Sequence, residues 1–153
     1  MVSQLEREIS KSIVVRRNIE AAFQIWTEQI TTWWPKSHSI SGNLKTTVIL
    51  EGKPGGRFYE RTPDGLEYDW GEVTLWEPPH RLVYNWYLGS SPRQPTQVEV
   101  HFTAEEQGIT RVDVKHYGPE LVGELWWARS ANYNSAWENV LPYFVAACNP
   151  QKT

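Results

Sequence analysis

Hydrophobic and polar residues alternate through the first segment of the chain, residues 6–17, and its many β-branched residues favour a strand. A short amphipathic helix is predicted directly after it. Asn18 is well suited to cap the helix N-terminus, and apolar residues recur at helical spacing through about Glu28. The chain therefore opens with a strand that is followed at once by a helix.

The next stretch, residues 31–42, has no regular spacing of apolar residues and contains Pro35 and Gly42. These features are typical of a loop or a single helical turn. The stretch presents two neighbouring indoles, Trp33 and Trp34. They have two readings: either they wall a pocket, or one fills the core while the other lies on the surface.

Strand patterns then follow one another without a helix between them. The sequences KPGG, TPDG and EEQG supply turns, so the strands are predicted to form an antiparallel meander. In the last two strands apolar residues alternate with polar ones, which indicates one dry face and one wet face. The six predicted strands span residues 44–51, 57–62, 66–76, 81–88, 96–104 and 109–117.

The tail of the chain is predicted to be helical. Ser135 and Glu138 have the spacing of a capping box, and Trp137, Leu141 and Phe144 share one face of the helix that would start there. The pattern as a whole predicts an α+β domain spanning residues 1–153, with a seven-stranded antiparallel sheet. Its dry face must be covered by the C-terminal helix, because no other element is long enough.

Charge and composition exclude several classes of function. The net charge is −3, without the basic excess typical of proteins that bind nucleic acid or membrane surfaces. The only cysteine, Cys148, rules out an intrachain disulfide and falls on the apolar face of the last helix, where a buried inert thiol is expected. The N-terminus lacks a signal peptide pattern, and no stretch is long and apolar enough to span a membrane, so a cytoplasmic location is expected.

The aromatic content is the unusual part of the composition. Nine Trp, seven Tyr and four Phe must either fill one bulky core or line a cavity. The predicted helix face and the dry face of the sheet place many of these rings opposite each other. A solid core would explain them equally well, so composition alone leaves both possibilities open.

The four histidines do not have the spacing of a metal site, and neither a metal nor a cofactor is predicted. His80 lies in a predicted turn and His101 on the wet face of its strand. His116 continues the dry face of the last strand and should point into the concave side of the sheet. There it either meets a hydrogen-bond partner in the core or offers the pocket a titratable group.

Charged residues gather on two paired strands, around Arg57 and Arg61 on one and Asp69 and Glu72 on the other. They are interpreted either as cross-strand pairs on the solvent side, together with Tyr59, Glu60 and Tyr68, or as a polar rim of the cavity. The KPGGR segment lacks the spacing of a phosphate-binding loop and precedes a strand, so it is interpreted as a hairpin connection. No nucleophile elbow is present.

Six motifs follow one another along the chain: NIEAAFQIWTE, WWP, GGRFYER with a DG turn after it, WGEVTLWEPPHRLVYNW, VEVHFTAEEQGITRVDVKH and AWENVLPYF. In this order and spacing, over nearly the full length, they resemble the START-related helix-grip (SRPBCC-type) superfamily. Within it, the chain is similar to the branch named for activators of the ninety-kilodalton heat-shock protein ATPase.

The resemblance implies a curved sheet that grips a long C-terminal helix, with a hydrophobic cavity between them. Members commonly bind apolar or aromatic small molecules, and some are polyketide cyclases or dehydratases. There are no family-wide catalytic residues to transfer. The eukaryotic co-chaperone of this branch has a separate docking domain, for which 153 residues leave no room, so chaperone activation is not the first expectation.

The function expected from the sequence is therefore binding of a small hydrophobic or aromatic molecule by a monomer or weak homodimer, without a cofactor. One alternative is a cofactor-free cyclase or dehydratase that uses His116 with Tyr84 or Tyr117 as a proton relay. The other is a chaperone-activator-like interaction protein. The residues expected to line the cavity are Trp33, Trp34, Tyr84, Trp86, Phe102, His116, Trp126, Trp137 and Leu141.

Overall fold

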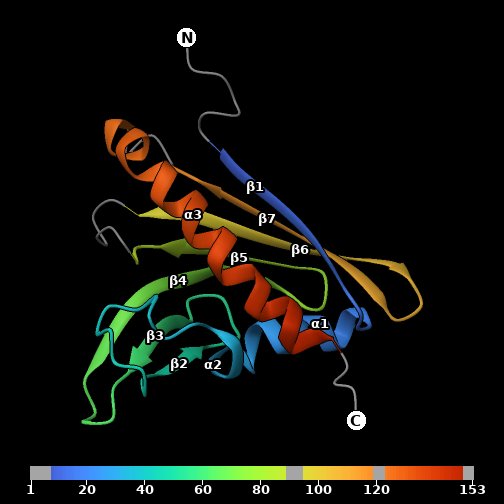
Figure 1. Ribbon diagram of the computed structural model, residues 1–153, viewed down its shortest axis with the longest axis horizontal. Helices are drawn as coiled ribbons and strands as arrows, with labels where there is room; N and C mark the ends of the chain where they lie inside the picture. The colour runs from blue at the N-terminus through green and yellow to red at the C-terminus, as the bar shows by residue number, and fades with distance from the viewer. Residues whose placement is uncertain (1–7, 89–94, 119–122, 150–153) are drawn as a thin grey trace.

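The computed structural model describes residues 8–88, 95–118 and 123–149, and in the last segment the side chains from residue 132 onward. Within these described residues, three helices and seven strands follow one another (Figure 1). In sequence order they are β1 Glu8–Val15, α1 Ile19–Thr27, α2 Ile30–Trp33, β2 Thr47–Leu50, β3 Arg57–Arg61, β4 Glu67–Glu77, β5 Arg81–Trp86, β6 Thr96–Glu106, β7 Ile109–Tyr117 and α3 Gly123–Cys148.

All seven strands form one antiparallel sheet, in the order β1-β7-β6-β5-β4-β3-β2. The helix α3 runs across the concave face of this sheet, and α1 and α2 lie at the end of the sheet where the C-terminal half of α3 arrives (Figure 1). The predicted α+β helix-grip architecture is confirmed. No helix in the described part of the chain is both long and apolar enough to cross a membrane.

The sheet curves because its strand pairing is interrupted at three places. The register shifts between Phe58 and Tyr59 in the β3–β4 pair, with further shifts in the β4–β5 and β6–β7 pairs. Gly71 lies beside the first of these shifts and opposite Trp86. A Cβ atom at Gly71 would meet the backbone oxygen of Asn85 at 2.1 Å, so only glycine permits this approach of β4 and β5.

The core lies between the concave face and the helices. The alternation predicted for β6 and β7 is confirmed, because Val98, Val100 and Phe102 are buried together with Val112 and Val114. The helix α1 is held at its start by Asn18, whose side chain accepts a hydrogen bond from Ala21 N at 2.8 Å. It adds a buried face of four apolar side chains, namely Ala22, Phe23, Ile25 and Trp26.

The start of the last helix differs from the prediction. The helix α3 begins at Gly123, so Ser135 and Glu138 lie inside it and do not form a capping box. The residues between 123 and 135 include neither proline nor an internal glycine, and nothing in them ends a helix before Ser135. Trp126 and Trp127, which lie outside clear strand periodicity in the sequence, are within this helix, and their side chains are outside the described part.

Candidate ligand-binding pocket

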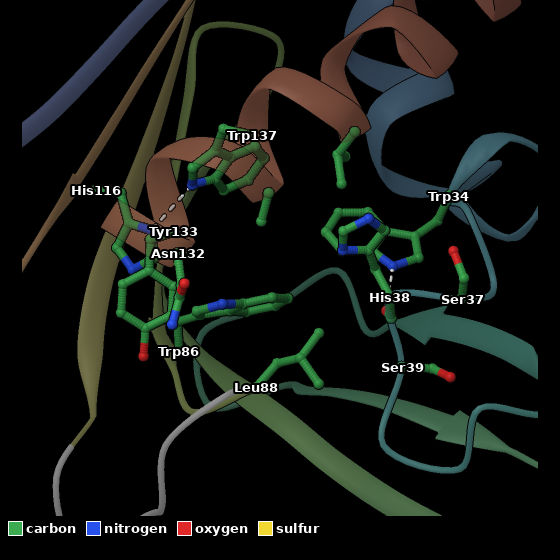
Figure 2. Close-up of a pocket in the computed structure, with 12 residues that line it drawn as sticks. Trp34, Ser37, His38, Ser39, Trp86, Leu88, His116, Asn132, Tyr133 and Trp137 are labelled. Atoms are coloured by element: carbon green, nitrogen blue, oxygen red, sulfur yellow. Dashed lines mark hydrogen bonds between the residues drawn. The ribbon is translucent and has the colours of Figure 1, made fainter. Parts of the chain in front are cut away.

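A pocket with a volume of about 320 Å³ opens between α3 and the concave face of the sheet. The loop after α2 closes one side of it, and β5, β7 and α3 form the others (Figure 2). Its volume lies at the lower end of the range for sites that bind small molecules. The lining residues are Trp34, Ser37, His38, Ser39, Trp86, Leu88, His116, Asn132, Tyr133, Ala136, Trp137 and Val140.

Aromatic and aliphatic side chains form most of the wall. Trp34 and Trp86 lie with their ring centroids 5.8 Å apart in an edge-to-face arrangement, and Trp34 also meets Trp137 at 6.3 Å. The indole N–H of Trp34 donates to the backbone oxygen of His38 at 2.8 Å, and that of Trp137 donates to Nδ1 of His116 at 2.9 Å (Figure 2). Both N–H groups are therefore already bonded within the protein.

His116 has both ring nitrogens hydrogen-bonded. Since Nδ1 accepts from Trp137, the neutral ring carries its proton on Nε2, which lies 2.7 Å from the hydroxyl of Thr96. That hydroxyl in turn donates to the backbone oxygen of Trp86 at 3.2 Å. The resulting chain of donors runs from α3 through β7 and β6 to β5.

His116 is also fully buried, and this burial lowers its pKa to about 3. The imidazole is therefore neutral at physiological pH. Its ring lies at the edge of the pocket, and its centroid is 4.5 Å from the ring centroid of Tyr133. Of the two roles predicted for His116, the geometry matches the hydrogen-bonded core residue.

The proton relay proposed from the sequence is not assembled. Tyr84 is completely buried in the core, and burial raises the pKa of its hydroxyl. Tyr117 follows His116 directly on β7 and so faces the opposite side of the sheet. Neither tyrosine lines the pocket together with His116.

The polar part of the pocket wall comes from the loop after α2 and from α3. Ser37, His38 and Ser39 lie on the loop, and the exposed side chain of Asn132 lies across from them on α3. The Ser39 hydroxyl donates to the backbone oxygen of Lys36 at 2.7 Å and accepts from Gly42 N at 2.9 Å. These groups give the pocket hydrogen-bonding atoms at its rim.

Four residues expected to line the cavity do not line this pocket. Trp33, Tyr84 and Phe102 are buried in the core. Trp33 packs against Trp26 and Phe144, and its N–H donates to Ile25 O at 2.7 Å. Leu141 borders a separate surface groove between α3 and β1. Trp34, Trp86, His116 and Trp137 do line the pocket, whereas the Trp126 side chain lies outside the described residues.

The structure adds residues to the pocket that the sequence reasoning did not single out. Tyr133, Ala136 and Val140 occupy the same helix face as Trp137, at spacings of three and four residues. This signal was present in the sequence, but the helix was predicted to begin only at Ser135. The other additions are Ser37, His38, Ser39, Leu88 and Asn132.

Other chemistry considered from the sequence takes no part in this pocket. Within the described residues, no group of three or more His, Cys, Asp or Glu side chains is arranged to hold a metal ion. Cys148 is buried near the end of α3, and burial raises the pKa of its thiol to about 12. The charged pairs of β3 and β4 lie on the solvent side, where Arg57 contacts Glu67 and Asp69.

Solved structures similar to this one include proteins of differing roles. CalC from Micromonospora echinospora, described as a self-sacrificing resistance protein, is 28% identical, with 94% of each chain covered and a TM-score of 0.71. Txn09, an anthrahydroquino-gamma-pyrone synthase, is 29% identical, with 95% of this chain and 91% of Txn09 covered and a TM-score of 0.57. An HSP90 activator from Plasmodium falciparum, PFC0360w, shares the fold at 21% identity, 73% coverage of each chain and a TM-score of 0.54.

None of the curated proteins matches the chain in sequence. A profile of one protein family, described as Activator of Hsp90 ATPase homolog 1-like protein, matches residues 16–141. This range runs from just after β1 into α3 and contains all twelve residues that line the pocket. The chain therefore belongs to the Activator of Hsp90 ATPase homolog 1-like protein family.

Proposed function

We propose that this protein binds a flat aromatic molecule of two or three fused rings in the pocket beneath α3. The observation that carries the proposal is the hydrogen bonding of the indoles in the pocket wall. The N–H groups of Trp34 and Trp137 are bonded to protein atoms, so these rings offer a ligand their apolar surfaces rather than hydrogen bonds.

The chemistry of the wall favours a particular class of ring. The faces of indoles carry negative electrostatic potential, so they attract electron-poor rings such as quinones. The rim residues Ser37 and His38 are polar, and they suit carbonyl or hydroxyl groups at the edge of such a ligand. The name of Txn09, a synthase of an anthrahydroquinone-type compound, is consistent with this class.

Binding, rather than catalysis through His116, is the function that we propose. A general base must have a free lone pair within reach of its substrate. Nδ1 of His116 accepts from Trp137, and its Nε2 is bonded to Thr96. The ring thus has no free lone pair to accept a proton from a molecule in the pocket.

The test uses alizarin, a dihydroxyanthraquinone, as the probe and decanoate as a flexible apolar comparison. We expect alizarin to raise the melting temperature and to quench tryptophan fluorescence in a saturable way, while decanoate has little effect. A ligand present at 100 times its Kd stabilises a folded protein by about 2.7 kcal/mol. An equal response to both compounds would contradict the preference for flat rings.

Two matched variants of α3 locate the binding site. Ala136 lines the pocket, so Ala136→Phe should fill it and weaken alizarin binding by at least about tenfold. Ala146 is exposed on the same helix and borders the groove near β1, so Ala146→Phe should leave the affinity unchanged. If Ala136→Phe binds alizarin as the unmodified protein does, the pocket is not the site.

A further inference from the structure

Glu60 is a fully buried carboxylate on β3, and it holds the loop that forms the pocket rim. Its side chain points to the same face of the strand as Phe58, beneath the loop after α2. Five hydrogen bonds reach its two oxygens. The donors are Ile40 N at 2.6 Å, Ser41 N at 3.1 Å, Ser41 Oγ at 2.6 Å, Thr46 Oγ1 at 2.7 Å and Trp70 Nε1 at 3.0 Å.

All five donors are neutral, and no lysine or arginine in the described part of the chain forms an ion pair with Glu60. Burial raises the pKa of this carboxyl, but hydrogen bonds from Ser41, Thr46 and Trp70 outweigh that effect and lower it below the ordinary value. Burying an ionised carboxylate is costly, so the donors around it must stay in place to satisfy its charge.

The residues that bind Glu60 continue directly into the pocket. Ile40 and Ser41 follow Ser37, His38 and Ser39 along the chain, and these three residues form the rim. Gly42 N donates to the Ser39 hydroxyl, which closes the turn between the rim and the Glu60 contacts.

A second connection passes through the aromatic wall. The indole of Trp70, which donates to Glu60, lies 5.5 Å from Trp34 and 6.0 Å from Trp86, measured between ring centroids. Trp70 therefore links Glu60 to two indoles of the pocket wall, just as Ile40 and Ser41 link it to the polar rim. The loop has no regular secondary structure of its own between Trp34 and Thr47 that would hold it there.

We infer that Glu60 is a positioning residue for the pocket: its carboxylate fixes residues 37–41, and with them the polar rim of the pocket. The inference rests on the function proposed above for the same pocket. It assigns the selectivity of the rim to a side chain that does not touch the ligand.

The first arm of the test needs no ligand. In Glu60→Gln, one oxygen becomes an NH₂ group that cannot accept from the hydroxyls of Ser41 and Thr46. We expect the amide exchange of Ile40 and Ser41 to accelerate at least about tenfold and the indole N–H resonance of Trp34 to shift. The amides of Val112 and Val114 should keep their protection, which a general loss of stability would lower.

The second arm measures alizarin affinity. Glu60→Gln should weaken it by about tenfold, whereas Glu72→Gln, which changes an exposed carboxylate on the adjacent strand, should leave it unchanged. If Glu60→Gln does not fold, Thr46→Val removes one donor while preserving shape, and a loss of a few-fold is expected.

The outcomes separate this inference from the proposed function. Unchanged exchange at Ile40 and Ser41 in the variant overturns the role of Glu60. Faster exchange with unchanged alizarin affinity shows that the loop is held but does not govern the pocket, and this also overturns the inference. If the unmodified protein binds no alizarin, the proposed ligand class fails, and the Trp34 resonance and the amide exchange decide the role of Glu60.

Discussion

Within the pocket wall, His116 acts as a connector between elements rather than as a group that exchanges protons. It accepts from Trp137 on α3 and is bonded to Thr96 on β6, so its neutral form satisfies both neighbours. Adding a proton would require Nδ1 to donate toward the indole N–H, which cannot accept it. The burial that lowers its pKa and the hydrogen bonds that fix its tautomer therefore act in the same direction.

This arrangement makes stability depend on pH with a definite sign. The unfolded chain binds a proton at His116 near its ordinary pKa of 6.5, whereas the folded protein does so only near 3. Between these values the unfolded state holds more protons, so the free energy of unfolding should decrease as the pH falls. The contribution of one such group is about 1.4 kcal/mol per pH unit.

The measurement is urea unfolding of the unmodified protein and of His116→Gln across this pH range. A glutamine side chain can accept from Trp137 and donate to Thr96 without titrating, so the variant should lose less stability on acidification. The carboxylates of the chain contribute equally to the pH dependence of both proteins, so their effect cancels in the comparison. Parallel curves for the two proteins would mean that His116 takes up its proton over the same pH range in the folded and unfolded states.

Single residues also show where sequence patterns were sufficient and where they were not. The alternation with Val112 and Val114 predicted that His116 faces inward, and it does. The same alternation places Glu60 on the face of Phe58, but the mixed pattern of the two strands left Glu60 either among solvent-side pairs or at a polar rim of the cavity. Its burial depends on donors from a loop without regular spacing, which a period of two residues cannot reveal.

At the level of elements, the pocket exists because the sheet curves away from a helix. Gly71 is central to this curvature, since it lies beside a register shift of the β3–β4 pair and lets the backbone of β5 pass close to β4. Its register partner on β5 is Trp86, one of the pocket walls. The shape of the sheet and the position of that wall are therefore linked through one residue without a side chain.

We expect Gly71→Ala to destabilise the protein by about 1–3 kcal/mol, because the new methyl group would overlap the backbone oxygen of Asn85. Displacing β5 should also move Trp86 and reduce alizarin quenching. The neighbouring substitution Glu72→Ala, at an exposed position, is the control for strand propensity. Thermal unfolding of both variants measures the difference, and equal melting temperatures would show that the strands separate without cost.

The elements themselves were predicted to within a few residues where turns bounded them. The last strand spans 109–117 both in the prediction and in the structure, because EEQG defines its beginning. The start of α3 was missed by twelve residues, since a capping-box spacing at Ser135 resembled an N-terminus. Helix periodicity alone does not distinguish an internal serine from a cap, and only the backbone on either side does so.

At the level of the whole molecule, a hydrogen bond joins the segment between β1 and α1 to the end of α3. The guanidinium of Arg17, between β1 and α1, donates through Nε to the backbone oxygen of Cys148 at 2.6 Å. These residues are separated by 131 positions in the sequence. The contact provides a partner for one of the last carbonyl groups of α3, which have none within the helix.

We expect Arg17→Ala to loosen the C-terminal end of α3 and so to expose the thiol of Cys148 more often. Alkylation by iodoacetamide should be slow in the unmodified protein, because burial keeps this thiol protonated and covered. A lost hydrogen bond of about 1 kcal/mol corresponds to an increase in rate of about fivefold. Arg16→Ala is the control, since Arg16 is exposed, and equal rates in both variants would contradict the anchoring role.

The overall architecture was predictable because strand order and turn chemistry leave few ways to arrange seven antiparallel strands and one long helix. The pocket was not predictable, since its volume depends on how far the sheet curves away from the path of the helix. Trp33 and Trp34 illustrate this limit. They are adjacent in sequence, yet Trp33 ends α2 and packs in the core, whereas Trp34 follows the helix in extended backbone and lines the pocket.

The packing of the indoles has an optical consequence. Trp34 has four other tryptophan rings, those of Trp33, Trp70, Trp86 and Trp137, within 6.3 Å of its own centroid. At such separations an excited ring passes its energy to a neighbour faster than it emits. A single absorbing molecule beside Trp34 would therefore quench the fluorescence of the whole group. The intrinsic fluorescence of the protein would then report an occupied pocket without any attached dye.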